Sequence, residues 1–243
     1  MAKKQRNYSF KTINWRYAFG EIAIVSIGIM LAFQLNSWRE RNSNRQLEKS
    51  SMLVLMGEVK KDSAIFHQYY MQANHHKQDG MAILQMLNSE DPNAHYDSLA
   101  NCFRRCGYYS GSVLHRSAFQ MMTAQGTLNL IKNDTLKNAI YSYYDRTHKV
   151  VEIWGTFEKQ MVDEVVPKMY QSGVIDDEQV LKTNGLRIFY KEKMFIDELL
   201  KDENKGRIAV YMRSQNDMIN VTNLNRRINK KLLDDLKKYV AKL

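Results

Sequence analysis

Two cysteines four residues apart are the first candidates for chemistry in this chain of 243 residues. On a helix, Cys102 and Cys106 would share one face, with Cα atoms about 6 Å apart, which is near the upper end of disulfide geometry. The spacing matches neither a redox C-x-x-C nor a haem C-x-x-C-H motif, so catalysis is not expected. The sequence leaves a structural disulfide and a pair of buried thiols open.

Three histidines invite a metal interpretation. His75 and His76 are adjacent, so on a helix they point about 100° apart and only one of them could join His67. No carboxylate at helical spacing completes a ligand set, and solvated side chains are the better account. We therefore expect no metal site and no cofactor.

A group of aromatic residues could suggest a cofactor pocket. Tyr141, Tyr143, Tyr144, Trp154 and Phe157 recur at helical spacing, which more often fills a core with hydroxyl groups at its edge. The sequence contains no Gly-rich phosphate loop, nucleophile elbow or zinc-binding helix motif. An enzyme is not expected.

A carboxylate stands next to a long apolar run in "GEIAIVSIGIMLAFQLNSW", residues 20–38. At about 100° per residue, Glu21, Gly28 and Ala32 fall on one stripe, and the two small residues permit close approach of another helix. We expect this stripe to form a helix-association face in which Glu21 pairs with a partner. The alternative is that Glu21 reaches to the membrane interface near Arg16.

The element that carries this stripe is predicted to span a membrane. Residues 17–38 form a helix of about 33 Å, which matches the thickness of the hydrocarbon core. A signal peptide is disfavoured because no small-x-small cleavage site follows, and a buried helix because cations and aromatic residues flank the run. We expect an uncleaved anchor, preceded by a basic cytoplasmic tail at residues 1–16.

The charge distribution suggests orientation and partners. The formal net charge is +10, and residues 1–38 contribute five cations and one acid. A short basic tail is hard to translocate, so the N-terminus is placed in the cytoplasm and residues 39–243 outside it. The remaining excess of positive charge is spread along the sequence, and no nucleic-acid recognition motif is present. Nucleic acid is therefore not an expected partner.

Two stretches resemble a known family. The pattern Gly20-Glu21-Ile22 with Val25, Gly28-Ile29, Leu31-Ala32, Asn36 and Trp38 is similar to the N-terminal signature of small Gram-negative membrane proteins classed as a domain of unknown function. The stretch 117–146, "SAFQMMTAQGTLNLIKNDTLKNAIYSYYDR", is similar to the second recurrent block of that family. The resemblance implies a single anchor with a helical domain, and it implies no activity. Because the family is Gram-negative, it also implies that the anchor lies in a bacterial inner membrane and residues 39–243 in the periplasm.

The rest of the chain reads as helical, since it holds only two prolines and 11 glycines in total. We expect a helix from the membrane to about residue 88, with a candidate break near Gly80. Further helices are expected from Asp97 to Cys106, from a Ser117–Gln120 capping box to Gly126, from Asn133 or Asp134 to about Val166, near 190–202 and over about 206–243. The last helix has an apolar stripe, Val221, Leu224, Ile228, Leu232, Leu236 and Val240, which packs in the domain, between subunits or on lipid.

The predicted fold class is all-α, with one N-terminal transmembrane helix continuing into an antiparallel bundle of three or four long helices. The predicted function is a membrane-anchored, non-enzymatic interaction or scaffold protein of the cell envelope. Its expected partners are the lipid bilayer and a membrane protein or a second copy of the chain. The alternative is a ligand-sensing module that signals through a separate membrane partner.

Overall fold

The computed structural model describes residues 15–107, 113–160, 163, 166–183, 185 and 187–243. These residues are almost entirely helical and form no strand, apart from a single antiparallel bridge between Ile175 and Tyr190. The prediction of an all-α chain is confirmed. The predicted tail at residues 1–16 lies almost wholly outside the described residues.

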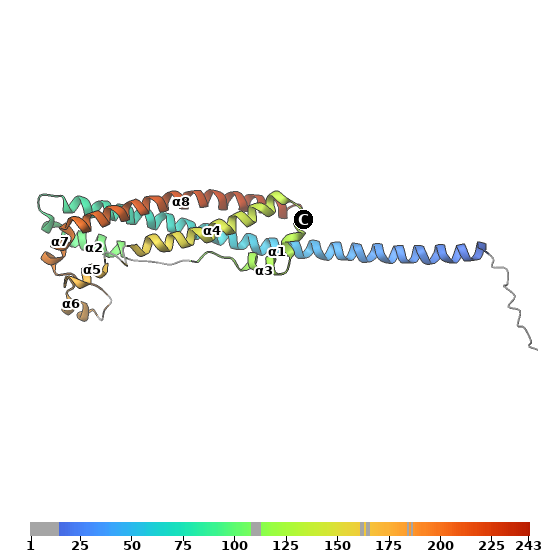
Figure 1. The fold of residues 1–243 in the computed structure, drawn as a ribbon, viewed down its shortest axis with the longest axis horizontal. Helices are drawn as coiled ribbons and strands as arrows, with labels where there is room; N and C mark the ends of the chain where they lie inside the picture. The colour runs from blue at the N-terminus through green and yellow to red at the C-terminus, as the bar shows by residue number, and fades with distance from the viewer. Residues whose placement is uncertain (1–14, 108–112, 161–162, 164–165, 184, 186) are drawn as a thin grey trace, which may run out of the picture.

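One helix runs the length of the molecule (Figure 1). Helix α1, Trp15–Leu87, has 73 residues and no break, and so extends about 110 Å. The expected break at Gly80 is wrong. A Cβ atom on Gly80 would lie 2.5 Å from the Cγ atom of Met212, so the glycine allows α8 to pack closely without interrupting α1.

The other long helices are α4, Asp134–Gln160, and α8, Asp202–Val240, and both lie beside the second half of α1 (Figure 1). Helix α8 runs opposite to α1. Lys205 near its start approaches Asn88 (3.5 Å), and Lys242 beyond its end accepts a hydrogen bond from Arg45 (3.1 Å). The described residues from 48 to 243 are called the helical body below.

Shorter elements connect these helices. They are η1 (Pro92–His95), α2 (Tyr96–Cys106), α3 (Ser117–Ala124), η2 (Thr127–Leu130), α5 (Val166–Gln171), α6 (Asp177–Lys182) and α7 (Glu192–Leu200). Gly126 has a φ of 70°, and so it ends α3 in the left-handed conformation that glycine adopts without strain.

Two clusters of buried apolar residues form the core. The first cluster packs the middle of α1 against α3, α4 and α8, with Phe66 and Trp154 at its centre. Their rings meet edge to face, with 6.0 Å between the centroids. The second cluster packs the end of α1 against α2, α7 and the start of α8, around Phe103 and Phe195. Burial in both clusters, rather than helix propensity alone, holds the long helices together.

Several predicted boundaries are wrong. Helix α2 begins at Tyr96, so Asp97 lies in its first turn and is not the cap. Helix α4 is described to Gln160 and α5 starts at Val166, so the end predicted near Val166 falls next to a stretch that lies partly outside the described residues. The helix expected at 190–202 spans Glu192–Leu200, and the last helix starts at Asp202.

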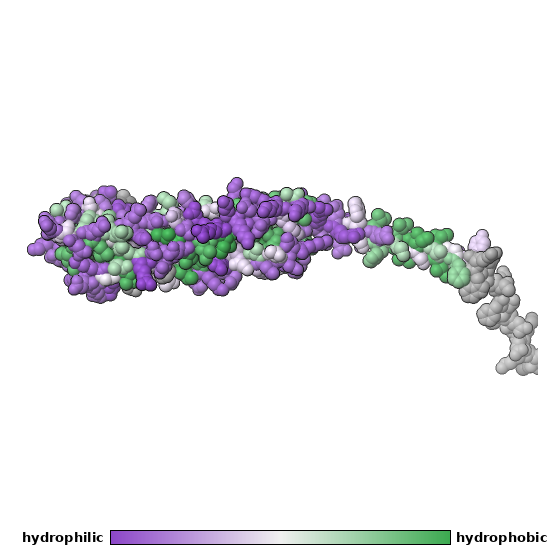
Figure 2. Space-filling model, turned by 90° about the horizontal axis from the view of Figure 1, so that it is seen from above, coloured by the Kyte–Doolittle hydropathy of each residue, from purple (hydrophilic) through white to green (hydrophobic). Residues whose placement is uncertain are grey.

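The apolar segment, residues 17–38, has no protein around it. Figure 2 shows a slender hydrophobic stretch that projects from a largely hydrophilic body. Phe33 is 71% exposed and Ile24 is 73% exposed. This helix is long and apolar enough to cross a membrane, and the part that would do so is not buried. It is therefore a candidate span, and within the described residues nothing covers it.

Candidate functional site

The predicted association face lies on the outer side of α1. Gly28 has no atom within 4 Å of an added Cβ, and Glu21 and Ala32 are exposed. The residues of α1 that face the core, such as Leu55, are turned about 170° away from this stripe on an ideal helix. Helices α4 and α8 lie on that opposite side. The stripe is therefore accessible to another helix, and its partner stays a prediction.

The two cysteines lie on α2 and are free thiols in this structure. Both are buried, and burial raises the pKa of each thiol. Arg105 Nη2 donates to Cys102 Sγ at 3.2 Å and to Asp79 Oδ1 at 2.6 Å, and Arg105 Nε donates to Asp79 Oδ2 at 2.8 Å. Because a thiol with a raised pKa is a weak nucleophile, this arrangement does not suit nucleophilic catalysis.

One of the three histidines departs from the expectation of solvated side chains. His67 and His75 are exposed, whereas His76 is only 6% exposed. Its Nδ1 atom lies 2.9 Å from the hydroxyl of Tyr211. Burial lowers the pKa of His76, and the negative charge of Asp79 opposes this shift. A partner on α8, far away in the sequence, explains why a histidine is tolerated at this position.

Sequence reasoning missed a buried carboxylate in the middle of α1. Asp62 is 0% exposed and accepts hydrogen bonds from the backbone N–H of His115 (2.9 Å) and the hydroxyl of Tyr143 (2.8 Å). His115 Nδ1 lies 2.9 Å from the same carboxylate. Tyr143 also accepts a hydrogen bond of 3.0 Å from Asn229. The network therefore joins α1, α4, α8 and the stretch before α3.

The hydrogen bonds of this network hold the helices in position relative to one another. Burial and the charge of Asp62 raise the pKa of Tyr143, which keeps its hydroxyl protonated as a donor. The amide of Asn229 also donates to the backbone carbonyl of Val59 at 2.8 Å. Asp62, Tyr143 and Asn229 thus each have a partner from another segment, which fixes how α4 and α8 register against α1.

A second carboxylate on α1 replaces the predicted capping box. Glu58 accepts hydrogen bonds from the Ser117 hydroxyl (2.8 Å) and from the Ala118 backbone N–H (2.9 Å) at the start of α3. The expected pairing of Ser117 with Gln120 is wrong, because a carboxylate from a distant helix satisfies these donors.

The sequence did contain a local signal that these acidic residues are buried. Glu48, Glu58 and Asp62 fall on the same face of α1 as Leu55 and Phe66. An acid within an apolar stripe is expected to have a buried partner. The sequence does not identify that partner, because it lies more than fifty residues away.

The structure confirms for most of the aromatic residues of α4 that they fill the core. Tyr143, Tyr144 and Trp154 are buried in the first cluster, whereas Tyr141 is 42% exposed. The expectation that their hydroxyl groups lie at the edge of the core is wrong for Tyr143, which donates to Asp62 in the interior. The side chain of Phe157 lies outside the described residues.

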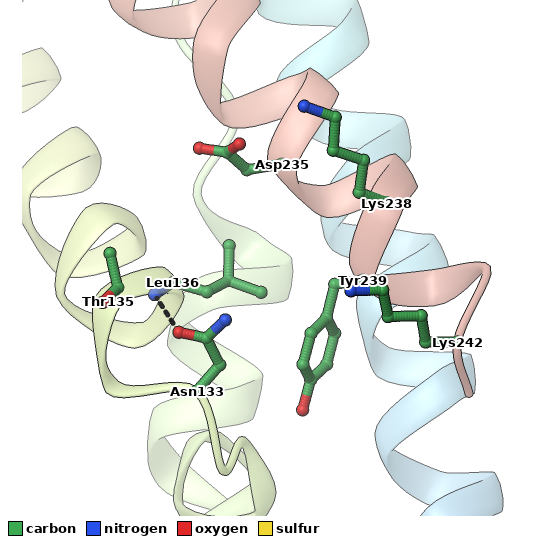
Figure 3. Close-up of a pocket in the computed structure, with 7 residues that line it drawn as sticks. All are labelled: Asn133, Thr135, Leu136, Asp235, Lys238, Tyr239 and Lys242. Atoms are coloured by element: carbon green, nitrogen blue, oxygen red, sulfur yellow. Dashed lines mark hydrogen bonds between the residues drawn. The ribbon is translucent and has the colours of Figure 1, made fainter.

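Two adjoining pockets lie where the helical body meets the free part of α1, and Tyr239 lines both. Figure 3 shows the smaller one, where the Tyr239 ring projects from the end of α8 toward Asn133 and Leu136 at the start of α4. Asn133 Oδ1 accepts a hydrogen bond of 3.1 Å from the Leu136 backbone, which confirms Asn133 as the cap of α4. The Tyr239 hydroxyl donates to Glu48 at 2.5 Å. Burial and this bond raise the pKa of Tyr239 to about 12.

The larger of the two pockets has a volume of about 530 Å³. Its lining comes from α1, the stretch from η2 to α4 and the end of α8, and consists of Arg41, Asn44, Arg45, Glu48, Asn129, Leu130, Lys132, Tyr239 and Leu243. A further pocket of about 370 Å³ lies along α1 beside α2, lined by His75, His76, Asp79, Arg105 and three neighbouring side chains. In the described part of the chain, no group of His, Cys, Asp and Glu is arranged to hold a metal ion.

Comparisons of this chain with protein-family models, with curated proteins and with solved structures found no match. The resemblance of residues 20–38 and 117–146 to a Gram-negative membrane family therefore stays a prediction.

Proposed function

We propose that this chain is a membrane-anchored, non-enzymatic interaction or scaffold protein of the cell envelope. Residues 17–38 cross a bacterial inner membrane once, with the N-terminus in the cytoplasm. Residues 39–243 form an antiparallel helical bundle in the periplasm. The single observation that carries this proposal is the contrast along α1, because the helix is bare over the apolar segment and covered from Glu48 onward.

The energetics favour a span over a water-exposed helix. Nine Ile, Leu, Val and Phe side chains of residues 17–38 contribute roughly −3 to −5 kcal/mol to insertion. Soluble proteins rarely expose an apolar surface this continuous. Glu21 lies near the end of the segment, where a carboxylate is tolerated better than at the membrane centre.

The association face supplies the interaction part of the proposal. Glu21, Gly28 and Ala32 lie on the side of α1 that no other described helix covers. Small residues four apart allow two helix backbones to approach closely in lipid. The partner is another membrane protein or a second copy of this chain.

The test uses the tagged full chain, crosslinked in native membranes and analysed by mass spectrometry. The double variant Gly28→Leu with Ala32→Leu should lower the yield of crosslinked partner about tenfold, because bulky side chains separate the helices. The control, Ala23→Leu with Ser26→Leu, enlarges two small residues on the opposite face and should leave the yield unchanged. Equal yields from both variants would overturn this association face.

Two further measurements address the remaining steps. A Glu21→Gln variant with unchanged crosslinking would remove the proposed role of the carboxylate. Alkaline carbonate should leave the wild-type chain in the membrane fraction, and its release would overturn the anchor.

A ligand sensor is the second candidate, favoured by the pocket beside α2. Its lining includes the Arg105 guanidinium and the buried His76, which could both bind a small polar molecule. This function requires a ligand-dependent rise in the melting temperature of the full chain. A screen of small metabolites without any such rise would count against it.

A further inference from the structure

The positive charge of the helical body is concentrated at the end next to the apolar segment. Three stretches meet there: residues 39–49 of α1, residues 130–138 around the start of α4, and residues 230–243 of α8 (Figure 1). Their side chains carry a combined formal charge of +6, which equals the whole surplus of residues 39–243. The other side chains of residues 39–243 therefore sum to zero. The surplus is diffuse along the sequence but gathers at one end of the fold.

The larger pocket at this end is lined by cations that have no anionic partner. Arg41, Arg45 and Lys132 line it from two segments, and none of them forms an ion pair within the described part of the chain. Glu48, the one acidic side chain in the lining, is only 7% exposed and accepts the hydrogen bond from Tyr239. The pocket is therefore suited to an anion from outside the chain.

The height of the pocket above the apolar segment suggests where that anion comes from. Arg41 and Arg45 follow Trp38 on the same unbroken helix, at a rise of about 4.5 and 10 Å. The headgroup region of a bilayer extends about 5–8 Å beyond each side of the hydrocarbon core. If residues 17–38 span the membrane, Arg41 lies within the headgroup region, and the Arg45 side chain, which tilts toward the N-terminal end of α1, reaches down to the same level.

We infer that this pocket binds the phosphate of an anionic phospholipid at the membrane surface. The guanidinium groups of Arg41 and Arg45 offer paired N–H donors that match phosphate oxygens, and Lys132 adds a third positive charge. Leu130 and Leu243 provide apolar contacts for the glycerol end of the acyl chains. This inference rests on the proposed function, because it requires α1 to cross the bilayer.

The test measures thermal unfolding of the full chain in detergent micelles that contain either phosphatidylglycerol or phosphatidylcholine. At a lipid concentration of about ten times Kd, phosphatidylglycerol should raise the Tm by about 3–6 °C relative to phosphatidylcholine. A triple variant, Arg41→Gln with Arg45→Gln and Lys132→Gln, should lose this gain. Each lost cation should weaken lipid binding roughly fivefold at low salt.

A matched control variant distinguishes an effect of the pocket from an effect of the overall positive charge. Lys60→Gln with Lys193→Gln and Arg213→Gln removes three exposed cations that also form no ion pair but lie away from the pocket. This variant should keep the gain from phosphatidylglycerol. Loss of the gain in both triple variants would overturn the pocket, and so would equal Tm values of the wild type in the two lipids.

Inorganic phosphate in phosphatidylcholine micelles distinguishes the two sources of the anion. A gain as large as that from phosphatidylglycerol would assign the pocket to a free anion and overturn the lipid. Carbonate extraction of the same preparations tests the anchor separately. A chain that stays in the membrane but shows no gain from phosphatidylglycerol refutes only the lipid site, whereas a chain released by carbonate refutes the anchor itself.

Discussion

The two halves of α1 have the same backbone conformation and opposite surroundings. Residues 17–38 expose apolar side chains on every face of the helix, whereas residues 48–87 bury one stripe and carry mostly polar side chains on the other faces. The second half obtains its stability from α4 and α8, and the first half has no such partner within the described chain. An unbroken helix can therefore pass between two solvents when only the distribution of its side chains changes.

The largest expected effect comes from removing the same side chain in each half. Phe66 is fully buried against Trp154, whereas Phe33 is 71% exposed. Phe66→Ala should lower the free energy of unfolding of the helical body by about 3–5 kcal/mol, because it leaves a cavity in the first cluster. Phe33→Ala should leave it unchanged.

Urea unfolding of the full chain in micelles, followed by Trp fluorescence, measures both changes. Equal losses in the two variants would mean that residues 17–38 also pack against the protein, and the comparison would fail.

A smaller effect is expected from removing one carboxylate inside the helical body and, as a control, one outside it. Asp62→Ala leaves the hydroxyl of Tyr143 and the backbone N–H of His115 without their acceptor. This should lower the free energy of unfolding of the helical body by about 3 kcal/mol. Glu40→Ala removes an exposed carboxylate on α1, outside the helical body, and should have no measurable effect on its stability.

The same urea titration measures this pair. A neutral outcome for Asp62→Ala would show that the polar network is not needed to hold α4 and α8 in register.

The smallest effect is a pH dependence near the end of α1. Because burial lowers the pKa of His76 below the ordinary value of 6.5, the unfolded chain binds a proton just below pH 6.5 that the folded chain does not. The stability of the helical body should therefore be full above pH 6.5 and decrease as the pH falls through this window.

Unfolding at a series of pH values checks the sign. His76→Gln should remove this component of the pH dependence, while His75→Gln, an exposed neighbour on α1, should retain it. If the stability of both variants depends on pH as in the wild type, a group other than His76 causes that dependence.

Features encoded by nearby residues were predictable. The end of α1 at Leu87, the Asn133 cap and the glycine turn at Gly126 all depend on side chains within a few positions.

Features that depend on distant partners were not predictable. The cap of α3 comes from Glu58, and His76 is buried because Tyr211 reaches it from α8. Leu224 belongs to the predicted apolar stripe of α8 but is 46% exposed, while Asn229 is buried. Its amide is satisfied by α1 and α4, so a polar residue replaces the expected apolar one. The cationic pocket likewise arises only when three separate segments meet.

The continuity of α1 fixes the rotational setting of the helical body relative to the apolar segment. By helical phase, Ser50, Leu53 and Gly57 point in nearly the same direction as Gly28, and Leu53 is 45% exposed. Two copies joined along Gly28 and Ala32 would therefore meet above the bilayer through the backs of their α1 helices, with α4 and α8 facing outward. Any rotation of one copy about its axis inside the lipid would turn its body through the same angle.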